Sequence, residues 1–368
     1  MDSLTHLALG AAIGTAVLGR RAGPRAALWG AVCGTLPDLD VFVPYGDPVR
    51  DFTFHRASSH SLVWLTIAAP AVAWIISRVA RRPGIAFRDW LALAWLALLA
   101  HPLLDAFTVY GTQLLLPFSD YPVAVGSVFI IDPLYTLPLV AGTAAATFWR
   151  TRDPARARRW NFAGLAASTM YLGWTAAAQT HVEGVVNRAV ASSVLADRPV
   201  LVTPAPFNSL LWRVVVMDDD GYHEGYHSLL ADGAPVEFER HSSEPHLLRT
   251  LQDDWNVRRL AWFSKGFYSV TEAAHDTAAA QGSASTLGQV LGIVDTAQAS
   301  VPGTTRGRRP IVMTDLRMGE TPWFVFSFVV AERDGGRITA VPALQLPMKS
   351  LPPDALDRLW RRLTTGRV

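Results

Sequence analysis

The sequence predicts an all-α membrane helical bundle of about six transmembrane helices, followed by a strand-rich α+β domain outside the cytoplasm. Half of the 368 residues are hydrophobic and only 17% are charged, whereas soluble domains contain about 25% charged residues. The apolar runs gather in residues 1–180, and residues 181–368 read as a water-soluble sequence. Arginine-rich and arginine-poor loops alternate along the first half. These three observations place a membrane domain at 1–180 and a soluble domain at 181–368.

Six apolar segments in the first half are the candidate helices. A spanning helix needs about 20 mostly apolar residues. The first two segments, Leu4–Gly19 and Ala26–Leu36, are shorter and rich in glycine and alanine, which is typical of closely packed membrane helices. The other four are Ser61–Ser77, Trp90–Leu116, Val128–Trp149 and Phe162–Thr180.

The loop charges give these helices a direction. Arginines cluster after the first, third and fifth segments: Arg20, Arg21 and Arg25, then Arg78, Arg81, Arg82 and Arg88, then Arg150, Arg152, Arg156, Arg158 and Arg159. Loops with excess basic residues stay in the cytoplasm. We therefore expect a multi-pass inner-membrane protein whose N-terminus, loops 37–60 and 117–127, and residues after Thr180 lie outside.

The second half contains short β-branched or aromatic runs that are bounded by Gly, Asp and Pro, a pattern typical of strands. These runs are Leu211–Met217, Tyr222–Leu230, Leu260–Tyr268, Pro310–Thr314, Trp323–Val330 and Ile338–Ala343. Ala355–Leu363 predicts a closing amphipathic helix. Glu272–Gln298 is small and polar, and reads as a weak helix or a loose insertion.

Several classes of function and site are disfavoured. A net charge of +2 is too small to indicate nucleic-acid binding. The single cysteine, Cys33, rules out an intramolecular disulfide. His223-Glu-Gly-Tyr-His227 fits the zinc-protease pattern in letters, but that motif requires a helix. Here it follows Asp218-Asp-Asp-Gly221, a turn signal between strand-like runs, so we expect a hairpin instead. No feature indicates a protein partner.

Aspartate and histidine are costly in membrane helices, so those in the first half require an explanation. They are His6, Asp38, Asp40, His55, His60, His101, Asp105 and Asp132. The expected topology places all eight at the outer side of the bundle. Single members have ordinary explanations: Asp38 and Asp132 can cap helices, and a lone loop histidine is usually structural. The convergence of all eight predicts a functional site.

Histidine and aspartate together suit a divalent metal, zinc most readily. His101 and Asp105 are four residues apart, so they share one face of a helix. Both can reach one ion, or Asp105 can orient the imidazole. His55-Arg56-Ala-Ser-Ser-His60 pairs two imidazoles with a guanidinium that can hold a phosphate. Asp38 or Asp40 can act as a general base.

These residues resemble motifs of the YdjM/YbcI family of inner-membrane, metal-dependent hydrolases. The motifs are His6 with its following glycines, Gly34-Thr-Leu-Pro37-Asp38-Leu-Asp40, His55-Arg-Ala-Ser-Ser-His60-Ser, His101-Pro-Leu-Leu-Asp105, and, more loosely, Pro206-Phe-Asn208-Ser-Leu-Leu-Trp212 and Thr314-Asp315-Leu-Arg317. The family is itself distantly similar to zinc phospholipase C. The resemblance implies metal ligands at His6, Asp38, His55, His60, His101 and Asp105, with Asp40 and Asp132 weaker candidates.

The expected function is therefore a membrane-bound, zinc-dependent hydrolase, with Asp38, Asp40 and Arg56 as catalytic candidates. A site at headgroup level suits a phospholipid or a lipid-linked phosphoester. Two alternatives remain open. The same His and Asp side chains can form a proton or ion relay in a transporter. The membrane half can also simply anchor a binding domain formed by 181–368.

Overall fold

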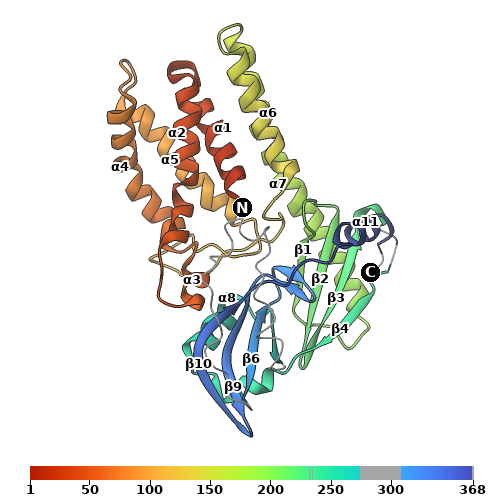
Figure 1. Cartoon of the computed structure of the whole chain (residues 1–368). Coiled ribbons are helices and arrows are strands. Elements are labelled where there is room, and N and C mark those ends of the chain that lie inside the picture. Colours follow the sequence, from red (N-terminus) through yellow and green to blue (C-terminus); the bar gives the residue numbers. More distant parts are fainter. Residues whose placement is uncertain (232, 234, 274–307, 367–368) are drawn as a thin grey trace. The chain divides into compact units, whose positions relative to one another are not determined.

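The structure, a computed structural model, describes residues 1–231, 233, 235–273 and 308–366. The chain forms two compact units, one mainly helical and one rich in strands (Figure 1). The first unit contains Met1–Val43, Phe54–Thr180 and Pro204–Ser209, and the second contains Pro44–Thr53, His181–Thr203 and Leu210–Val368. The division falls at Thr180, apart from two short segments that each belong to the other unit. Most of the expected insertion Glu272–Gln298 lies outside the described residues.

The helices of the first unit begin at clear sequence signals. They are α1 (Ser3–Ala22), α2 (Pro24–Thr35), α4 (Leu62–Ala80), α5 (Phe87–Asp105), α6 (Pro133–Trp149) and α7 (Pro154–Val190), with the short 3₁₀ helices η1 (Leu36–Phe42) and η2 (Ser58–His60). Asp2, Ser61 and Asp132 cap α1, α4 and α6 by accepting hydrogen bonds from backbone N–H groups. Such caps satisfy donors that have no partner within the helix.

Glycines let α1 and α2 pack backbone against backbone. A Cβ atom added to Gly30 would lie 2.1 Å from the carbonyl oxygen of Gly10, and one added to Gly34 would lie 2.6 Å from that of His6. Gly10 and Gly14 repeat at four-residue spacing on α1, as Gly30 and Gly34 do on α2. Small residues at this spacing allow close helix contacts in membranes. This packing brings the start of α1 beside the end of α2.

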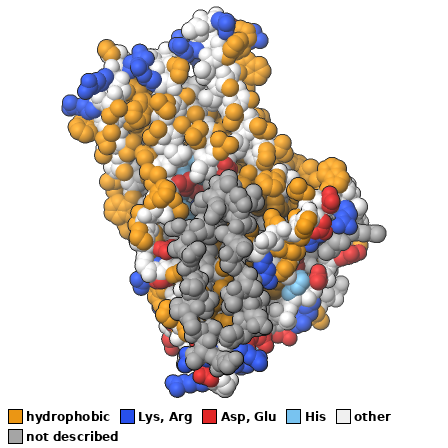
Figure 2. Space-filling model, viewed as in Figure 1, with side chains coloured by type: hydrophobic (Ala, Val, Ile, Leu, Met, Phe, Trp, Pro, Cys, Tyr) orange, Lys and Arg blue, Asp and Glu red, His pale blue; other side chains and the backbone are white. Residues whose placement is uncertain are grey.

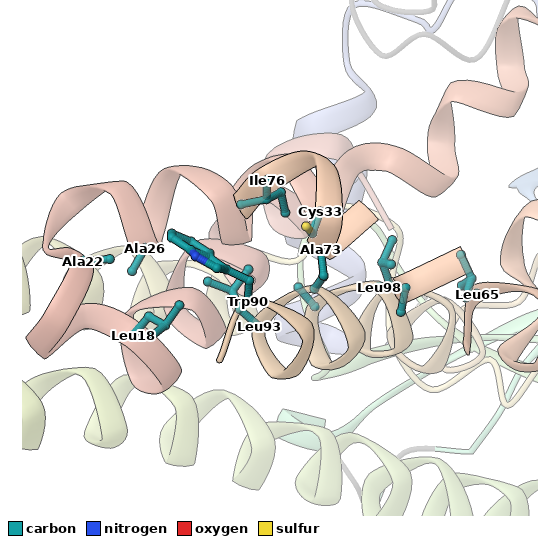
Figure 3. Packing of buried hydrophobic residues seen from close by; sticks show 13 residues of the cluster. Leu18, Ala22, Ala26, Cys33, Leu65, Ala73, Ile76, Trp90, Leu93 and Leu98 are labelled. Carbon is teal, nitrogen blue, oxygen red and sulfur yellow. The ribbon is translucent and has the colours of Figure 1, made fainter. Parts of the chain in front are cut away.

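A hydrophobic cluster holds α1, α2, α4 and α5 together. Trp90 of α5 is buried among Leu18, Ala22 and Ala26 from the first two helices (Figure 3). Ala69, Ala73 and Ile76 supply the α4 side of the same cluster. The small side chains let the helices approach closely, and the large indole fills the space that they leave.

Two helices in the described part of the chain, α4 and α5, are long and apolar enough to cross a membrane. The prediction of six such helices is therefore corrected. At 12 and 17 residues, α2 and α6 are shorter than a bilayer requires. α1 ends in Arg20 and Arg21, and the 37-residue α7 starts among arginines and ends in a polar stretch. Each apolar segment contains a helix, although Trp90–Leu116 is helical only to Asp105. Among the described helices, α4 and α5 alone combine the length and the hydropathy of a candidate span.

The arginine-rich turns lie together at one end of the first unit. These turns join α1 to α2, α4 to α5, and α6 to α7, and Figure 1 shows them side by side. Lys and Arg side chains accordingly gather at this end, and hydrophobic side chains cover much of the surface beyond it (Figure 2). The opposite end carries the start of α1, the end of α2, the start of α4, the end of α5 and the start of α6. His6, His101, Asp105 and Asp132 lie at these helix ends, and Asp38, Asp40, His55 and His60 lie in the chain between the end of α2 and the start of α4.

The second unit contains two four-stranded sheets. The first has the order β1 (Val200–Pro204), β2 (Leu211–Asp218), β3 (Gly221–Ser228) and β4 (Phe238–Ser242). The second has the order β10 (Arg337–Leu346), β9 (Ser327–Asp334), β6 (Arg308–Asp315) and β5 (Tyr268–Glu272). The short strands β7 (Gly319–Glu320) and β8 (Trp323–Phe324) pair separately. The described part of the unit also contains the helices α8 (Trp255–Phe263) and α11 (Ala355–Thr365) and the 3₁₀ helices η3 (Leu229–Ala231) and η4 (Pro245–Leu251).

Most predicted strands and the closing helix are confirmed, with one clear error. The run Leu260–Tyr268 was expected to be a strand, but it contains the end of α8 and only the first residue of β5. Asp254 caps α8 by accepting hydrogen bonds from the N–H groups of Asn256 and Val257. This cap favours a helix over a strand for the first part of the aromatic run.

The His-Glu-x-x-His pattern lies in a strand, as expected. β2 and β3 pair antiparallel, with Asp218 opposite Gly221 at the hairpin turn. Glu224 of the pattern forms a buried ion pair with Arg213. Burial alone would raise the pKa of Glu224, but the Arg213 guanidinium holds it below its usual value. Glu224 is thus part of the packing of the second unit.

Candidate metal centre

Four side chains from three segments of the first unit converge on one point. Asp38 comes from η1, His60 from the end of η2, and His101 and Asp105 from the last turn and a half of α5. One ligand atom from each residue lies within 4.8 Å of every other. The sequence spacing predicted that His101 and Asp105 share a helix face. The structure adds Asp38 from η1 and His60 from η2.

The distances between these atoms fit a small ion at their centre. His101 Nε2 lies 3.0 Å from His60 Nε2 and 3.3 Å from both Asp38 Oδ1 and Asp105 Oδ2. His60 Nε2 lies 3.4 Å from Asp105 Oδ2 and 3.6 Å from Asp38 Oδ1. Ligand bonds of about 2.0–2.1 Å imply edges of roughly 3.3–3.4 Å in a tetrahedral zinc site. The observed distances scatter around that length.

Asp105 Oδ2 supports this interpretation independently. It is fully buried, and it has no hydrogen-bond partner among the described residues, although two imidazole nitrogens lie within 3.4 Å. A buried carboxylate oxygen without a partner is costly. Ligand atoms that all point at a common centre lie close together but are poorly aligned for hydrogen bonds with one another. Asp105 Oδ2 and the two imidazole nitrogens show this arrangement. An ion at that centre would satisfy the oxygen.

His101 is oriented by the backbone of α2. Its Nδ1 donates to the carbonyl oxygen of Gly34 at 2.6 Å. With the proton held on Nδ1, Nε2 presents its lone pair to the cluster, as in many metal sites. The close packing of α1 against α2 therefore fixes a ligand on α5. Sequence reasoning missed this contact because a backbone carbonyl leaves no signal in the residue pattern.

Asp40 holds the segment that carries His60. Its carboxylate accepts hydrogen bonds from His55 Nδ1 at 2.9 Å, from the N–H of Arg56 at 3.1 Å, and from the Ser59 hydroxyl. Burial alone would raise the pKa of Asp40, but His55 and His60 hold it below its usual value. The roles predicted for Asp40 as a base and for His55 as a ligand remain predictions. In the structure, both residues brace the loop outside the group of four.

The second oxygen of Asp105 faces donors. Asp105 Oδ1 lies 3.1 Å from His6 Nε2 and 3.3 Å from Arg56 Nη2, and it also contacts the amino group of Met1. Arg56 Nη1 donates to the Thr108 hydroxyl at 3.1 Å. The guanidinium is therefore buried against Asp105, and its predicted role as a phosphate clamp remains a prediction. Thr108 was not anticipated from the sequence.

His6 and Asp132 lie outside the group of four. The His6 ring stacks on that of His101, with centroids 3.6 Å apart, and the predicted role of His6 as a metal ligand stays a prediction. Asp132 caps α6, and its Oδ2 accepts a hydrogen bond from the Tyr171 hydroxyl at 2.8 Å. The ordinary explanation of Asp132 as an N-cap thus matches its contacts.

Asp38 is the most accessible member of the group. Its side chain is 19% exposed, whereas those of His60, His101 and Asp105 are fully buried. Burial alone would raise the pKa of Asp38, but the imidazoles of His101 and His60 hold it below its usual value. Asp38 is therefore an ionised carboxylate, which metal ligation requires. Asp38 is thus the member of the group that solvent reaches.

Exposed apolar side chains occur in the segments next to the centre. Leu39, Val41 and Phe42 alternate with or follow Asp38 and Asp40 along η1, and Phe42 is 80% exposed. The loop between α5 and α6 adds Leu115, Phe118 and Tyr121. This loop is attached to the His60 segment by hydrogen bonds from Leu62 N–H to the Leu114 carbonyl and from Gln113 N–H to the Arg56 carbonyl. We call these six exposed side chains the apolar rim.

The donor set fits a divalent ion in chemistry as well as geometry. Two imidazoles and two carboxylates are ligands that zinc accepts, and tetrahedral coordination suits it. Two ionised carboxylates also balance a double positive charge. The structure thus holds a buried group of four residues with the donors, spacing and charge that a divalent metal needs.

Comparison with known proteins covers the helical half of the chain. Residues 1–182 match the model of a family described as YdjM inner membrane protein. The uncharacterized protein YfhP of Bacillus subtilis (strain 168) is 29% identical over 159 residues, which are 40% of this chain and 46% of YfhP. The inner membrane protein YbcI of Escherichia coli (strain K12) is 34% identical over 120 residues, 32% of this chain and 68% of YbcI. The match thus spans less than half of YfhP. No solved structure matches the chain.

Proposed function

Because the chain belongs to the YdjM inner membrane protein family through residues 1–182, we propose that it is a membrane-bound, zinc-dependent hydrolase. The observation that carries the proposal is the convergence of Asp38, His60, His101 and Asp105, whose donor atoms all lie within 4.8 Å of one another. A single compact centre at one end of a helical unit favours catalysis over a proton or ion relay, which needs polar groups along a path.

The proposed substrate is a phospholipid or another lipid-linked phosphoester. The apolar rim supports this class, because exposed Phe, Tyr and Leu side chains suit the boundary between headgroups and acyl chains. Asp38 shares the short helix η1 with three members of the rim. A lipid whose chains contact the rim would therefore present its phosphate close to the accessible edge of the centre.

Zinc held by the four side chains, if it took a water molecule as a fifth ligand, would lower the pKa of that water and polarise a phosphoryl oxygen. In the proposed hydrolysis, the water oxygen bonds to phosphorus and the P–O bond to the alcohol breaks. The second oxygen of Asp38, Oδ2, would take the water proton and pass it to the departing alkoxide. His101 is held by Gly34, and Arg56 neutralises the second oxygen of Asp105. In this scheme Asp40 positions the His60 segment.

We also propose that the metal end faces the outside of the inner membrane and that the second unit is extracytoplasmic. The support is the gathering of the arginine-rich turns at the other end of the first unit, which the positive-inside rule assigns to the cytoplasm.

Metal analysis of the purified full chain tests the proposal. We expect close to one zinc ion per chain, lost in both His60→Ala and His101→Ala. His246→Ala is the matched control, because His246 is exposed in the second unit, and it should keep the metal. Phospholipid vesicles should release a phosphorylated headgroup or free phosphate with the wild type, and a chelator should abolish the release. Metal-free wild-type protein, or turnover unaffected by the chelator, would refute the proposal.

A further inference from the structure

A short segment between Asp38 and His60 in the sequence belongs to the second unit. Residues Pro44–Thr53 group with the strand-rich unit, although they lie in sequence between the ligands Asp38 and His60. This segment contains most of the helix α3 (Pro48–Phe54). The chain therefore leaves the first unit after one ligand and returns to it before the next.

Aromatic packing holds α3 within the second unit. The Phe52 side chain is buried, with its ring centroid 4.3 Å from that of Phe326, 4.9 Å from Phe263 and 5.4 Å from Phe328. Phe263 ends α8, and Phe328 lies on β9. Aromatic pairs at these distances add to the effect of burial. Phe52 is thus a core residue of a unit otherwise built from residues after 180.

Polar contacts fix the same helix from α8. Arg259 Nε donates to the Thr53 hydroxyl at 3.1 Å, and Thr53 is fully buried. The Arg50 guanidinium lies 4.9 Å from the ring centroid of Trp255, in cation–π contact. Both ends of the α3 helix are therefore restrained within the second unit.

The residues after α3 lead directly to the centre. His55 follows the last residue of the helix, and its Nδ1 donates to Asp40. Arg56 has a φ of 62°, a left-handed conformation that few non-glycine residues adopt, and its N–H donates to the same carboxylate. Hydrogen bonds from Ala57 N–H to the Phe54 carbonyl and from His60 N–H to the Ala57 carbonyl complete the path. Two successive backbone hydrogen bonds thus connect Phe54 to His60.

We propose that the second unit positions the metal ligand His60 through α3, with Phe52, Thr53 and Arg259 as positioning residues. The proposal rests on the metal centre of the proposed function. The strand-rich unit thereby has a structural function that is not evident from its sheets alone. The unit holds the loop between two ligands in the shape that brings His60 to within 3.4 Å of Asp105.

Zinc affinity and backbone exchange together test the proposal in the full chain. Phe52→Ala should weaken zinc binding roughly 10- to 100-fold, the range found when outer-shell partners of ligands are removed. Hydrogen–deuterium exchange should speed up across residues 54–61, where the Arg56 N–H is bonded to Asp40. Phe52→Leu should restore much of the zinc affinity and of the slow exchange, because leucine refills most of the space that alanine leaves empty. Arg259→Ala should cause part of the loss of zinc affinity seen with Phe52→Ala.

Val215→Ala is the matched control, because Val215 is fully buried in the core of the other sheet of the same unit. It should destabilise the second unit without changing zinc affinity or exchange over 54–61. Equal effects of Phe52→Ala and Val215→Ala, or no effect of Phe52→Ala on exchange, would overturn the proposal. A wild type that binds no zinc would instead defeat the proposed function, and the exchange rates would still decide whether α3 holds the loop.

Discussion

Asp40 concentrates three hydrogen bonds on one carboxylate, from His55, the Arg56 N–H and Ser59. We predict that Asp40→Asn keeps the fold but weakens zinc binding roughly 10- to 100-fold. An amide group can accept through only one of its two ends, so at least one of the three donors loses its partner. Isothermal titration of zinc into the metal-free chain measures the change.

The same titration separates Asp40 from a true ligand. Asp105→Asn removes a charged donor from the group of four and should abolish tight binding altogether. If Asp40→Asn bound zinc as tightly as the wild type, the bracing role would be wrong. If it bound none, Asp40 would have to be counted among the ligands.

At the scale of single residues, the sequence identified the residues of the candidate metal centre better than it identified the role of each one. His101 and Asp105 could be paired because helix geometry fixes a four-residue spacing. His60 and Asp38 could be named as candidates, but their arrival beside His101 depends on how three segments pack. The sequence could not show that Asp40, His55 and Asp132 lie outside the group of four. The same residue type can cap a helix, hold a loop by hydrogen bonds or bind a metal.

The contact between α1 and α2 gives a prediction at the scale of elements. Gly30→Ala places a Cβ atom 2.1 Å from the Gly10 carbonyl oxygen and 2.8 Å from Gly14 Cα. The helices must separate, at a cost of about 1–3 kcal/mol typical of overpacking. The Gly34 carbonyl that orients His101 would shift as well. We expect a lower unfolding temperature and weaker zinc binding, measured by circular dichroism and titration.

Gly173→Ala provides the control for that substitution. Gly173 lies within α7, and a Cβ atom there would have nothing within 4 Å. Alanine is also the better helix former, so stability should stay the same or rise slightly. A Gly30→Ala variant as stable as Gly173→Ala would show that the helices do not need their close contact.

Elements were predicted well where a single pattern decided them. The strand pairing of β2 with β3 followed from two β-branched or aromatic runs joined by the Asp-Asp-Asp-Gly turn. Leu260–Tyr268 failed because the aromatic run alone cannot distinguish strand from helix, and the Asp254 cap decided in favour of α8. The helix α3 was missed altogether, because Phe52 lies in a short, mixed segment whose burial depends on residues more than 200 positions away in the sequence.

The direction of the whole molecule in the membrane yields a further prediction. In a Cys33→Ala background, Phe118→Cys should react with a membrane-impermeant maleimide in intact bacterial cells. Arg82→Cys should react only after the cells are permeabilised, because the positive-inside rule assigns its turn to the cytoplasm. Phe118 is 83% exposed in the apolar rim, whereas native Cys33 is fully buried, so the background signal should be low.

The opposite labelling pattern would place the metal end in the cytoplasm and contradict the proposed orientation. Labelling of both positions in intact cells would contradict the membrane placement itself. The arginine pattern predicted that the polar residues gather at one end, and the helix order confirms this. It overestimated the number of spanning helices, because apolar composition does not show where a helix stops.

The exchange of short segments between the two units has a consequence for how such a chain can arise. The second unit includes Phe52, which comes from the first half of the chain. The first unit includes Ser209, which comes from the second half and accepts hydrogen bonds from Tyr171 and Trp174. YbcI has about half the length of this chain, because 120 residues make up 68% of it. Joining a strand-rich module to the end of such a short protein would not by itself reproduce this architecture. Residues 44–53 would also have to pack against that module, so the two halves depend on each other through these ten residues.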